Sequence, residues 1–123
     1  MTHTLPVCLA IAVLAAGCGS NSATTPSQPA AATFTITPSG ISPKSVTVSR
    51  GSQVQYVNND TRNHNMASDP HPEHTDCPPI NAVGFLVPGQ SRQTENLNTA
   101  RTCGFHDHDD PDNANWKGSI VIQ

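Results

Sequence analysis

Short stretches in which apolar and polar residues alternate recur along the chain after residue 33, separated by turn residues. They span residues 34–37, 45–49, 53–58, 91–97, 101–105 and 118–122. Alternation with a period of two is typical of β-strands that bury one face. No stretch of ten residues shows helical periodicity, and the eleven prolines oppose long helices. The pattern predicts an all-β domain, either a sandwich or a small barrel.

The segment from residue 62 to residue 83 departs from this pattern and predicts a long irregular loop. Residues 54–58 alternate as a strand does, and Asn59 and Asp60 then form a turn-like pair ahead of His64. We therefore expect a strand that delivers His64 into the loop. A loop of this length in a compact domain is usually functional.

The N-terminus reads as an export signal followed by a tether. Residues 7–16 form an apolar run that is too short to span a membrane and suits a signal peptide. Residues 14–18 resemble the lipobox of bacterial lipoproteins, which implies lipidation of Cys18; a plain cleaved signal is the alternative. We assign residues 1–17 to the signal, 18–32 to a disordered tether and 33–123 to the folded domain. The protein is then exported and lipid-anchored in the bacterial envelope, facing the periplasm or the cell exterior.

Charge is distributed unevenly along the chain. Only six Lys and Arg residues are present and they do not cluster, so nucleic-acid binding has no electrostatic basis here. Most acidic residues and five of the six histidines fall in residues 60–76 and 106–112. We expect these two segments to be neighbours in the fold.

The motifs along residues 34–123 resemble those of the cupredoxin family. They are Thr47-Val48, Gly51-Ser52, the stretch from Tyr56 to Asp60 with His64, Pro88-Gly89-Gln90-Ser91, the run from Cys103 to His108, and the run from Lys117 to Val121. The resemblance implies a cupredoxin-like Greek-key β-sandwich with copper ligands at one end. His64 matches the family's first histidine ligand.

The last ligand loop can be matched to the family in two ways. In the first, Cys103 is the thiolate ligand and His106 the histidine that follows it. In the second, Asp107 stands at the thiolate position, Asp110 at the second histidine and Trp116 at the axial methionine. A blue-copper site exists only in the first.

Cysteine counting favours the second match. With Cys8 inside the signal and Cys18 lipidated, Cys77 and Cys103 remain in an oxidising compartment. An even pair there is more often joined than free, so we predict a Cys77–Cys103 disulfide. The alternative, with Cys103 as a ligand, leaves Cys77 as a free thiol.

We predict a histidine-rich metal site on His64, His106 and His108. His106 and His108 lie two residues apart, so an extended chain points both to one face. His71, His74, Met66 and Cys103 are further possible ligands, and nearby Asp side chains can fix the imidazole tautomers. Three imidazoles suit Cu(II) or Zn(II). The resemblance to cupredoxins implies copper, with zinc as the second choice.

Three functions follow from these observations. The first is a membrane-tethered envelope protein that binds or hands over copper, with an unidentified protein partner. The second is a blue-copper electron carrier that uses His64, Cys103 and His106. The third is a metal-free structural or interaction domain on the same fold. No arrangement of catalytic residues indicates an enzyme.

Overall fold

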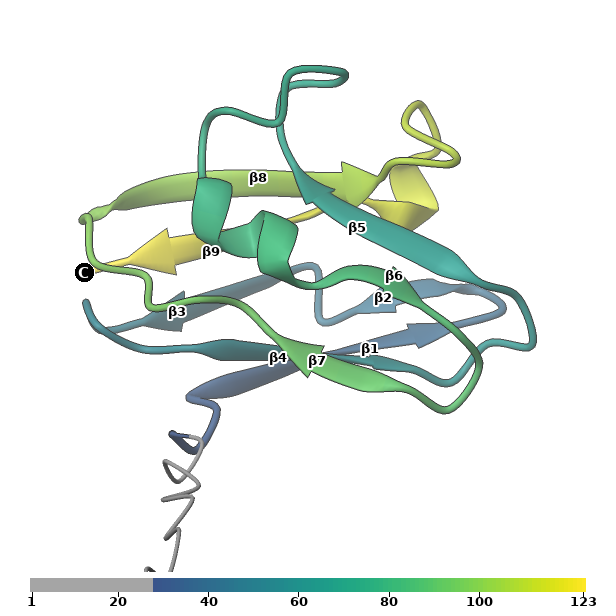
Figure 1. The fold of residues 1–123 in the computed structure, drawn as a ribbon, viewed down its shortest axis with the longest axis horizontal. Helices are drawn as coiled ribbons and strands as arrows, with labels where there is room; N and C mark the ends of the chain where they lie inside the picture. The colour runs from purple at the N-terminus through teal and green to yellow at the C-terminus, as the bar shows by residue number, and fades with distance from the viewer. Residues whose placement is uncertain (1–27) are drawn as a thin grey trace, which may run out of the picture.

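Residues 28–123, as the computed structural model describes them, form two β-sheets packed face to face (Figure 1). The four-stranded sheet has the order β2 (Gly40–Ser42), β1 (Ala32–Thr37), β4 (Val54–Asn58) and β7 (Ser91–Gln93). The five-stranded sheet has the order β3 (Ser45–Val48), β9 (Gly118–Ile122), β8 (Arg101–Asp107), β5 (His64–Ser68) and β6 (Gly84–Leu86). The prediction of an all-β sandwich is confirmed.

Two 3₁₀ helices complete the described part of the chain, η1 (Pro78–Ala82) and η2 (Ala114–Trp116). Neither of them is long and apolar enough to cross a membrane. The expected signal peptide, the lipidation site at Cys18 and most of the tether lie outside the described residues.

Strands that are distant in sequence pair with one another. β1 is parallel to β4 and β3 is parallel to β9, whereas β8 is antiparallel to both β5 and β9. The chain therefore crosses between the sheets, as the expected Greek-key connection requires. This arrangement brings β5 and β8, the strands of the two histidine-rich segments, side by side.

Aromatic residues from both sheets fill the centre of the sandwich. Phe34 of β1, Tyr56 of β4 and Phe105 of β8 are fully buried, and their ring centroids lie 4.7–5.2 Å apart. Ring pairs at these distances contribute beyond the burial of their area. Trp116 is also buried, whereas Phe85 is exposed.

Several element boundaries differ from the sequence-based prediction. The stretch 62–83 is not one irregular loop, because it contains β5 and η1. His64 begins β5 rather than following a strand end, and β8 continues two residues past Phe105. β5 reads His-Asn-Met-Ala-Ser, without the β-branched and aromatic residues that favour strands. Its strand conformation comes from pairing with β6 and β8.

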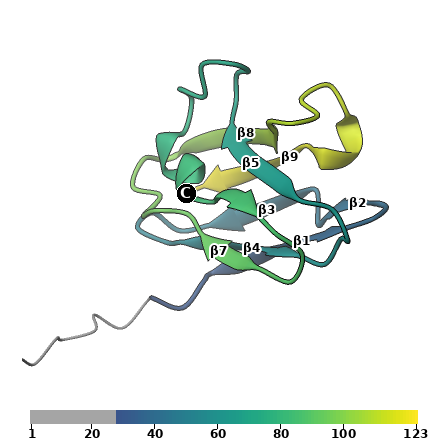
Figure 2. The same cartoon turned by 45° about the vertical axis from the view of Figure 1, so that its right-hand side comes forward.

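Residues 69–76, which we call the histidine loop, connect β5 to η1 and rise above the five-stranded sheet, away from the other sheet (Figures 1 and 2). Hydrogen bonds close the foot of the loop: the Asp76 amide donates to the Asp69 carbonyl at 2.9 Å, and the Cys77 amide donates to Ser68 Oγ at 2.7 Å. Cys77 is joined to Cys103 of β8 by a disulfide, with Cα atoms 5.8 Å apart. This pairing confirms the predicted disulfide.

Candidate metal centre

Strand alternation sends neighbouring residues of β8 to opposite faces of the five-stranded sheet. Phe105 points into the core, and Asp107, two residues on, is buried on the same side. His106 therefore points to the outer face, opposite Ala67 of β5 in the strand register. His108 follows the end of β8 and continues on the outer side, its amide donating to the Asn65 carbonyl at 2.7 Å.

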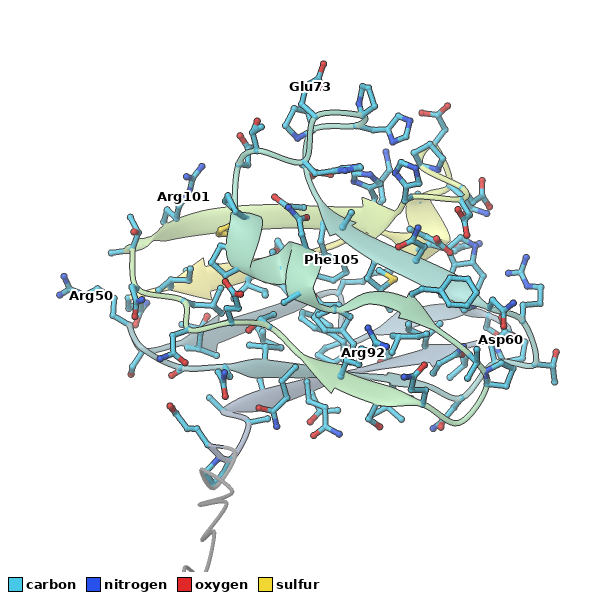
Figure 3. The ribbon with its side chains drawn as sticks, viewed as in Figure 1. Arg50, Asp60, Glu73, Arg92, Arg101 and Phe105 are labelled. Carbon is cyan, nitrogen blue, oxygen red and sulfur yellow. A yellow bond between two sulfur atoms is a disulfide. The ribbon has the colours of Figure 1, made fainter. Side chains whose placement is uncertain are left out.

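The histidine loop brings two more imidazoles over this outer face. One ligand nitrogen from each of His71, His74, His106 and His108 lies within 4.8 Å of the others. We call these four side chains the imidazole group. His108 Nδ1 lies 3.1 Å from His74 Nε2, and the ring centroids of His71 and His74 lie 4.8–5.6 Å from each other and from those of His106 and His108. In Figure 3, Glu73 marks the top of the loop that carries His71 and His74.

His106 is held in one orientation by a carboxylate. Its Nδ1 lies 2.6 Å from Asp69 Oδ1, and only 1% of the residue is exposed. A carboxylate only accepts hydrogen bonds, so in the neutral ring the proton lies on Nδ1 and the lone pair on Nε2. That Nε2 is buried and has no hydrogen-bond partner among the described residues. A buried, unpaired acceptor among other imidazoles fits a metal ligand, because such atoms are otherwise nearly always paired.

A glycine makes room for the orienting carboxylate. Asp69 lies opposite Gly104 across the β5–β8 pair, and its amide donates to the Gly104 carbonyl at 3.0 Å. A Cβ atom placed on Gly104 would overlap the Asp69 carboxylate. The absence of a side chain at residue 104 therefore lets Asp69 lie over β8 and reach His106.

His74 adopts a left-handed backbone conformation, with φ of 54°, which non-glycine residues seldom adopt. Two hydrogen bonds support it: its amide donates to the Pro70 carbonyl at 2.7 Å, and Asn81 Nδ2 donates to its carbonyl at 2.9 Å. Burial lowers the pKa of His74, and the neighbouring imidazoles, His108 foremost, lower it further. The ring therefore favours its neutral form, which is the form that binds metals.

His64 lies outside the imidazole group, contrary to the prediction that it joins His106 and His108. It points to the inner face, where Nδ1 lies 2.7 Å from Asp107 Oδ2 and Nε2 lies 3.0 Å from Asp60 Oδ2. The Trp116 ring packs against it with centroids 4.7 Å apart. Alternation gives the physical reason, because residues 64 and 106 point to opposite faces of the paired strands.

The carboxylate of Asp60 is stabilised in its charged form. Burial raises its pKa, but hydrogen bonds from His64, the Thr61 amide and Arg62 outweigh this effect, and the pKa lies below its usual value. Both ring nitrogens of His64 thus lie within hydrogen-bond distance of a carboxylate oxygen. His64 is therefore a structural residue, which contacts Asp60 and Asp107 inside the sandwich.

Sulfur takes no part in the imidazole group. Cys103 is bonded to Cys77 and fully buried, so the alternative in which Cys103 is a thiolate ligand is wrong. Met66 is buried in the core instead of joining the histidines. His64, Asp107 and Trp116, which the second family match places at ligand positions, do lie together, as a hydrogen-bonded and packed cluster.

The arrangement can hold a metal ion of borderline softness. Neutral imidazoles are good ligands for Cu(II) and Zn(II), and four of them satisfy the coordination that either ion prefers. The sequence did not identify the roles of two residues at this site. Asp69 is the carboxylate that orients His106, and Gly104 leaves the space that the Asp69 side chain occupies. The run Asp-Pro-His-Pro-Glu-His indicated that His71 and His74 are possible metal ligands. The carboxylate that contacts His106 could not be predicted in this way, because it depends on the strand register.

Comparison with known proteins identifies the fold. No protein-family model and no curated protein sequence matches this chain. A purple cupredoxin from Nitrosopumilus maritimus is similar in structure, with a TM-score of 0.59 and 16% identity over 75% of this chain and 99% of that chain.

Two further solved structures give the same result. Plastocyanin from Dryopteris crassirhizoma has a TM-score of 0.57 and 21% identity, covering 74% of this chain and 99% of that chain. Amicyanin from Paracoccus versutus has a TM-score of 0.58 and 18% identity, covering 78% and 85%. The fold is cupredoxin-like, as the sequence motifs implied.

Proposed function

We propose that this protein binds copper through His71, His74, His106 and His108 on the outer face of the five-stranded sheet. The buried Nε2 of His106 carries the proposal, since it has no partner among the described residues and lies among three other imidazoles. A site of this kind uses no thiolate, so we expect it to hold or pass on copper rather than to carry electrons as a blue-copper protein does.

Copper is preferred over zinc because of the fold. The similar structures include a purple cupredoxin, and a mutant amicyanin among them is described in its Cu(I) form. Cu(II) also lies above Zn(II) in the general order of affinities for nitrogen ligands. Zinc remains the second candidate, because imidazole ligands alone suit both ions.

The proposal places the protein in the bacterial envelope, attached through a lipid on Cys18. Its support is the lipobox-like sequence at residues 14–18 together with the Ser-, Pro- and Ala-rich stretch that follows. The exposed His71 suits transfer, because it is the member of the imidazole group most open to solvent and to a partner. Replacing Cys18 with Ser should move the protein from the membrane fraction to the soluble fraction.

Titration of the metal-free protein with Cu(II), with Zn(II) as competitor, tests the proposal. We expect one equivalent of Cu(II) to bind with only weak visible absorption and with nitrogen hyperfine structure in its EPR spectrum. The His106→Asn variant should bind much more weakly, whereas His64→Gln serves as the control histidine outside the group. An intense charge-transfer band, or equal affinity of the His106→Asn variant and the wild type, would contradict the assignment.

A further inference from the structure

The proposed ligands come from two segments that are far apart in sequence. His71 and His74 belong to the histidine loop, while His106 and His108 lie at the end of β8. The disulfide joins these same two segments. Cys77 lies three residues after His74, and Cys103 lies three residues before His106. The covalent link therefore fixes the two halves of the imidazole group relative to each other.

Little else holds the histidine loop in place. Every residue from 70 to 76 is exposed except His74, which is half-buried, so the loop gains almost no stability from apolar burial. Its other ties are hydrogen bonds at its foot, the bond from Asn81 Nδ2 to the His74 carbonyl, and the contacts of His74 with His108 and of Asp69 with His106. Such bonds contribute only about 1 kcal/mol each in net terms. Without the disulfide, the loop would sample many positions relative to β8.

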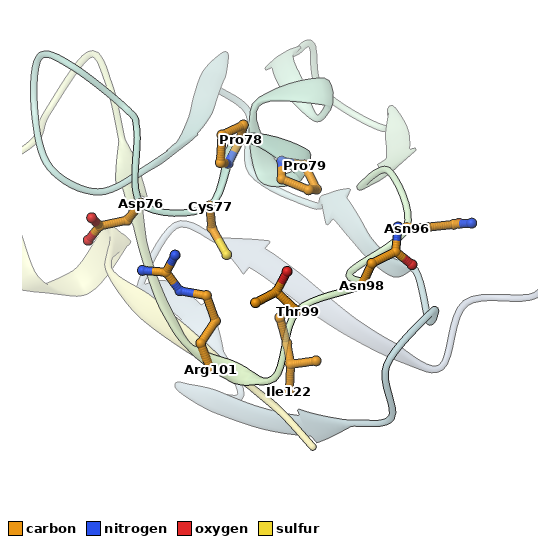
Figure 4. A pocket seen from close by; sticks show the side chains of 9 residues that line it. All are labelled: Asp76, Cys77, Pro78, Pro79, Asn96, Asn98, Thr99, Arg101 and Ile122. Carbon is orange, nitrogen blue, oxygen red and sulfur yellow. The ribbon is translucent and has the colours of Figure 1, made fainter.

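A cleft of about 250 Å³ opens beside the disulfide and is lined by Cys77 (Figure 4). The Cys77 side chain points into it, with Arg101 and Thr99 on either side, and Pro78, Pro79 and Asn98 also line it. Within residues 28–123, Arg101 forms no ion pair; Asp76 is the one carboxylate lining the cleft. A cation at this position favours an approaching thiolate over a neutral thiol. Cys77 itself is 4% exposed, at the wall of the cleft, and Cys103 is completely buried.

We propose that the Cys77–Cys103 disulfide is a redox clamp of the metal site, opened by a dithiol protein that attacks Cys77 through this cleft. The inference rests on the proposed function. A thiolate of the reductant attacks Cys77 Sγ, the S–S bond breaks, and Cys103 leaves as a thiolate that takes up a proton. The reductant's second thiol then attacks its own sulfur in the mixed disulfide. This releases Cys77 as a thiol and oxidises the reductant to a disulfide.

The consequence is that reduction loosens the loop and lowers the affinity for the metal. The Cys77→Ala/Cys103→Ala variant should bind Zn(II) and Cu(II) about tenfold or more weakly than the wild type, a typical coupling between sites. Ile36→Ala, a core substitution in β1 of the other sheet, is the control for lost global stability and should keep wild-type affinity. Zn(II) is the main probe because dithiols do not reduce it.

A second measurement uses the wild-type chain, in case the double variant does not fold. Zn(II)-loaded protein is reduced with a thioredoxin-class dithiol protein in the presence of a chromogenic chelator. The chelator is chosen so that it does not remove zinc from the oxidised protein. Zinc release should follow disulfide loss, measured by mass spectrometry. Arg101→Gln should slow the reduction, whereas Arg92→Gln, on β7, should not.

The outcomes separate the two proposals. If the oxidised wild type binds neither metal, the proposed function fails. If it binds metal, and either the folded double variant binds as tightly or fully reduced wild type keeps its zinc, the redox clamp is wrong while the metal site stands. Equal reduction rates for Arg101→Gln and wild type would overturn the role of the cleft.

Discussion

The orientation of a single imidazole depends on one carboxylate and one missing side chain. Asp69 accepts the hydrogen bond from His106 Nδ1 and leaves Nε2 free for a metal ion. Carboxylates that orient ligand histidines typically change metal affinity by about 10–100-fold when removed. Asp69→Ala should therefore weaken Cu(II) binding by about that factor, measured by competition with a chelator.

Two further variants, Gly104→Ala and Asp109→Ala, serve as controls for this prediction. Gly104→Ala keeps every ligand and every charge, yet its Cβ would displace the Asp69 carboxylate, so it should weaken binding in the same direction. Asp109→Ala removes an exposed carboxylate next to His108 and should leave the affinity unchanged. Equal losses in Asp69→Ala and Asp109→Ala would indicate a general effect of charge instead of orientation of His106.

The lowered pKa of His74 links stability to pH in the metal-free protein. Because the folded state binds this proton less readily than the unfolded state, protonation favours unfolding. The free energy of unfolding should be fully retained above the unfolded histidine pKa of about 6.5 and decrease as the pH falls below it. Urea unfolding at several pH values between 7.5 and 5 measures this slope.

The His74→Asn variant isolates this contribution. Asparagine tolerates the left-handed conformation that residue 74 adopts, so the backbone should be preserved. The variant should lose less stability on acidification than the wild type. Identical slopes in the two proteins would show that another group governs the pH dependence.

β8 separates two kinds of chemistry on its two faces. Its inner face places Asp107 against His64, and its outer face presents His106 to the histidine loop. His64→Gln should thus lower the free energy of unfolding by about 1–3 kcal/mol, because buried carboxylates lose a hydrogen-bond partner. Its affinity for Cu(II) should equal that of the wild type in the same titration used for the His106→Asn variant. A parallel loss of copper affinity would place His64 in the site after all.

The strands differ in how far their sequences determine them. β1, β3, β4 and β9 alternate apolar and polar residues, and the sequence predicts each of them. The sequence does not predict β5, because its residues gain strand conformation only from pairing with β6 and β8, which are distant in the chain. The error at His64 follows from this omission: a histidine in a loop can turn toward His106, whereas one at the start of a strand is bound to the face that pairing gives it.

The fold as a whole could be predicted from the sequence, but the position of the metal site could not. Short alternating segments and turn residues suffice for a two-sheet architecture. The site depends instead on the register in which β5 meets β8, which no local pattern determines. Two long-range contacts could be predicted. The clustering of acidic residues and histidines predicted that the two histidine-rich segments are neighbours. The number of cysteines left in the domain predicted the disulfide.

That disulfide should also contribute to global stability. It closes a loop between residues separated by 26 positions, for which chain-entropy arguments give about 3 kcal/mol. Reduction should lower the midpoint of denaturant unfolding accordingly, with metal absent from both samples. Peptide mapping of the non-reduced full chain should recover one peptide pair linked through Cys77 and Cys103. Two alkylated peptides in its place would contradict the pairing.

The position of β9 in the five-stranded sheet sets a condition on how the chain can fold as it is made. β9 leaves the ribosome after all the other strands, yet it lies between β3 and β8 and pairs with both. Until residues 118–122 emerge, β3 has no partner in this sheet, β8 has one unpaired edge, and Ile120 is missing from the core. Open edges invite pairing with other chains. The sandwich must therefore close after translation of its last strand, and a chain stalled at Trp116 would be prone to aggregate.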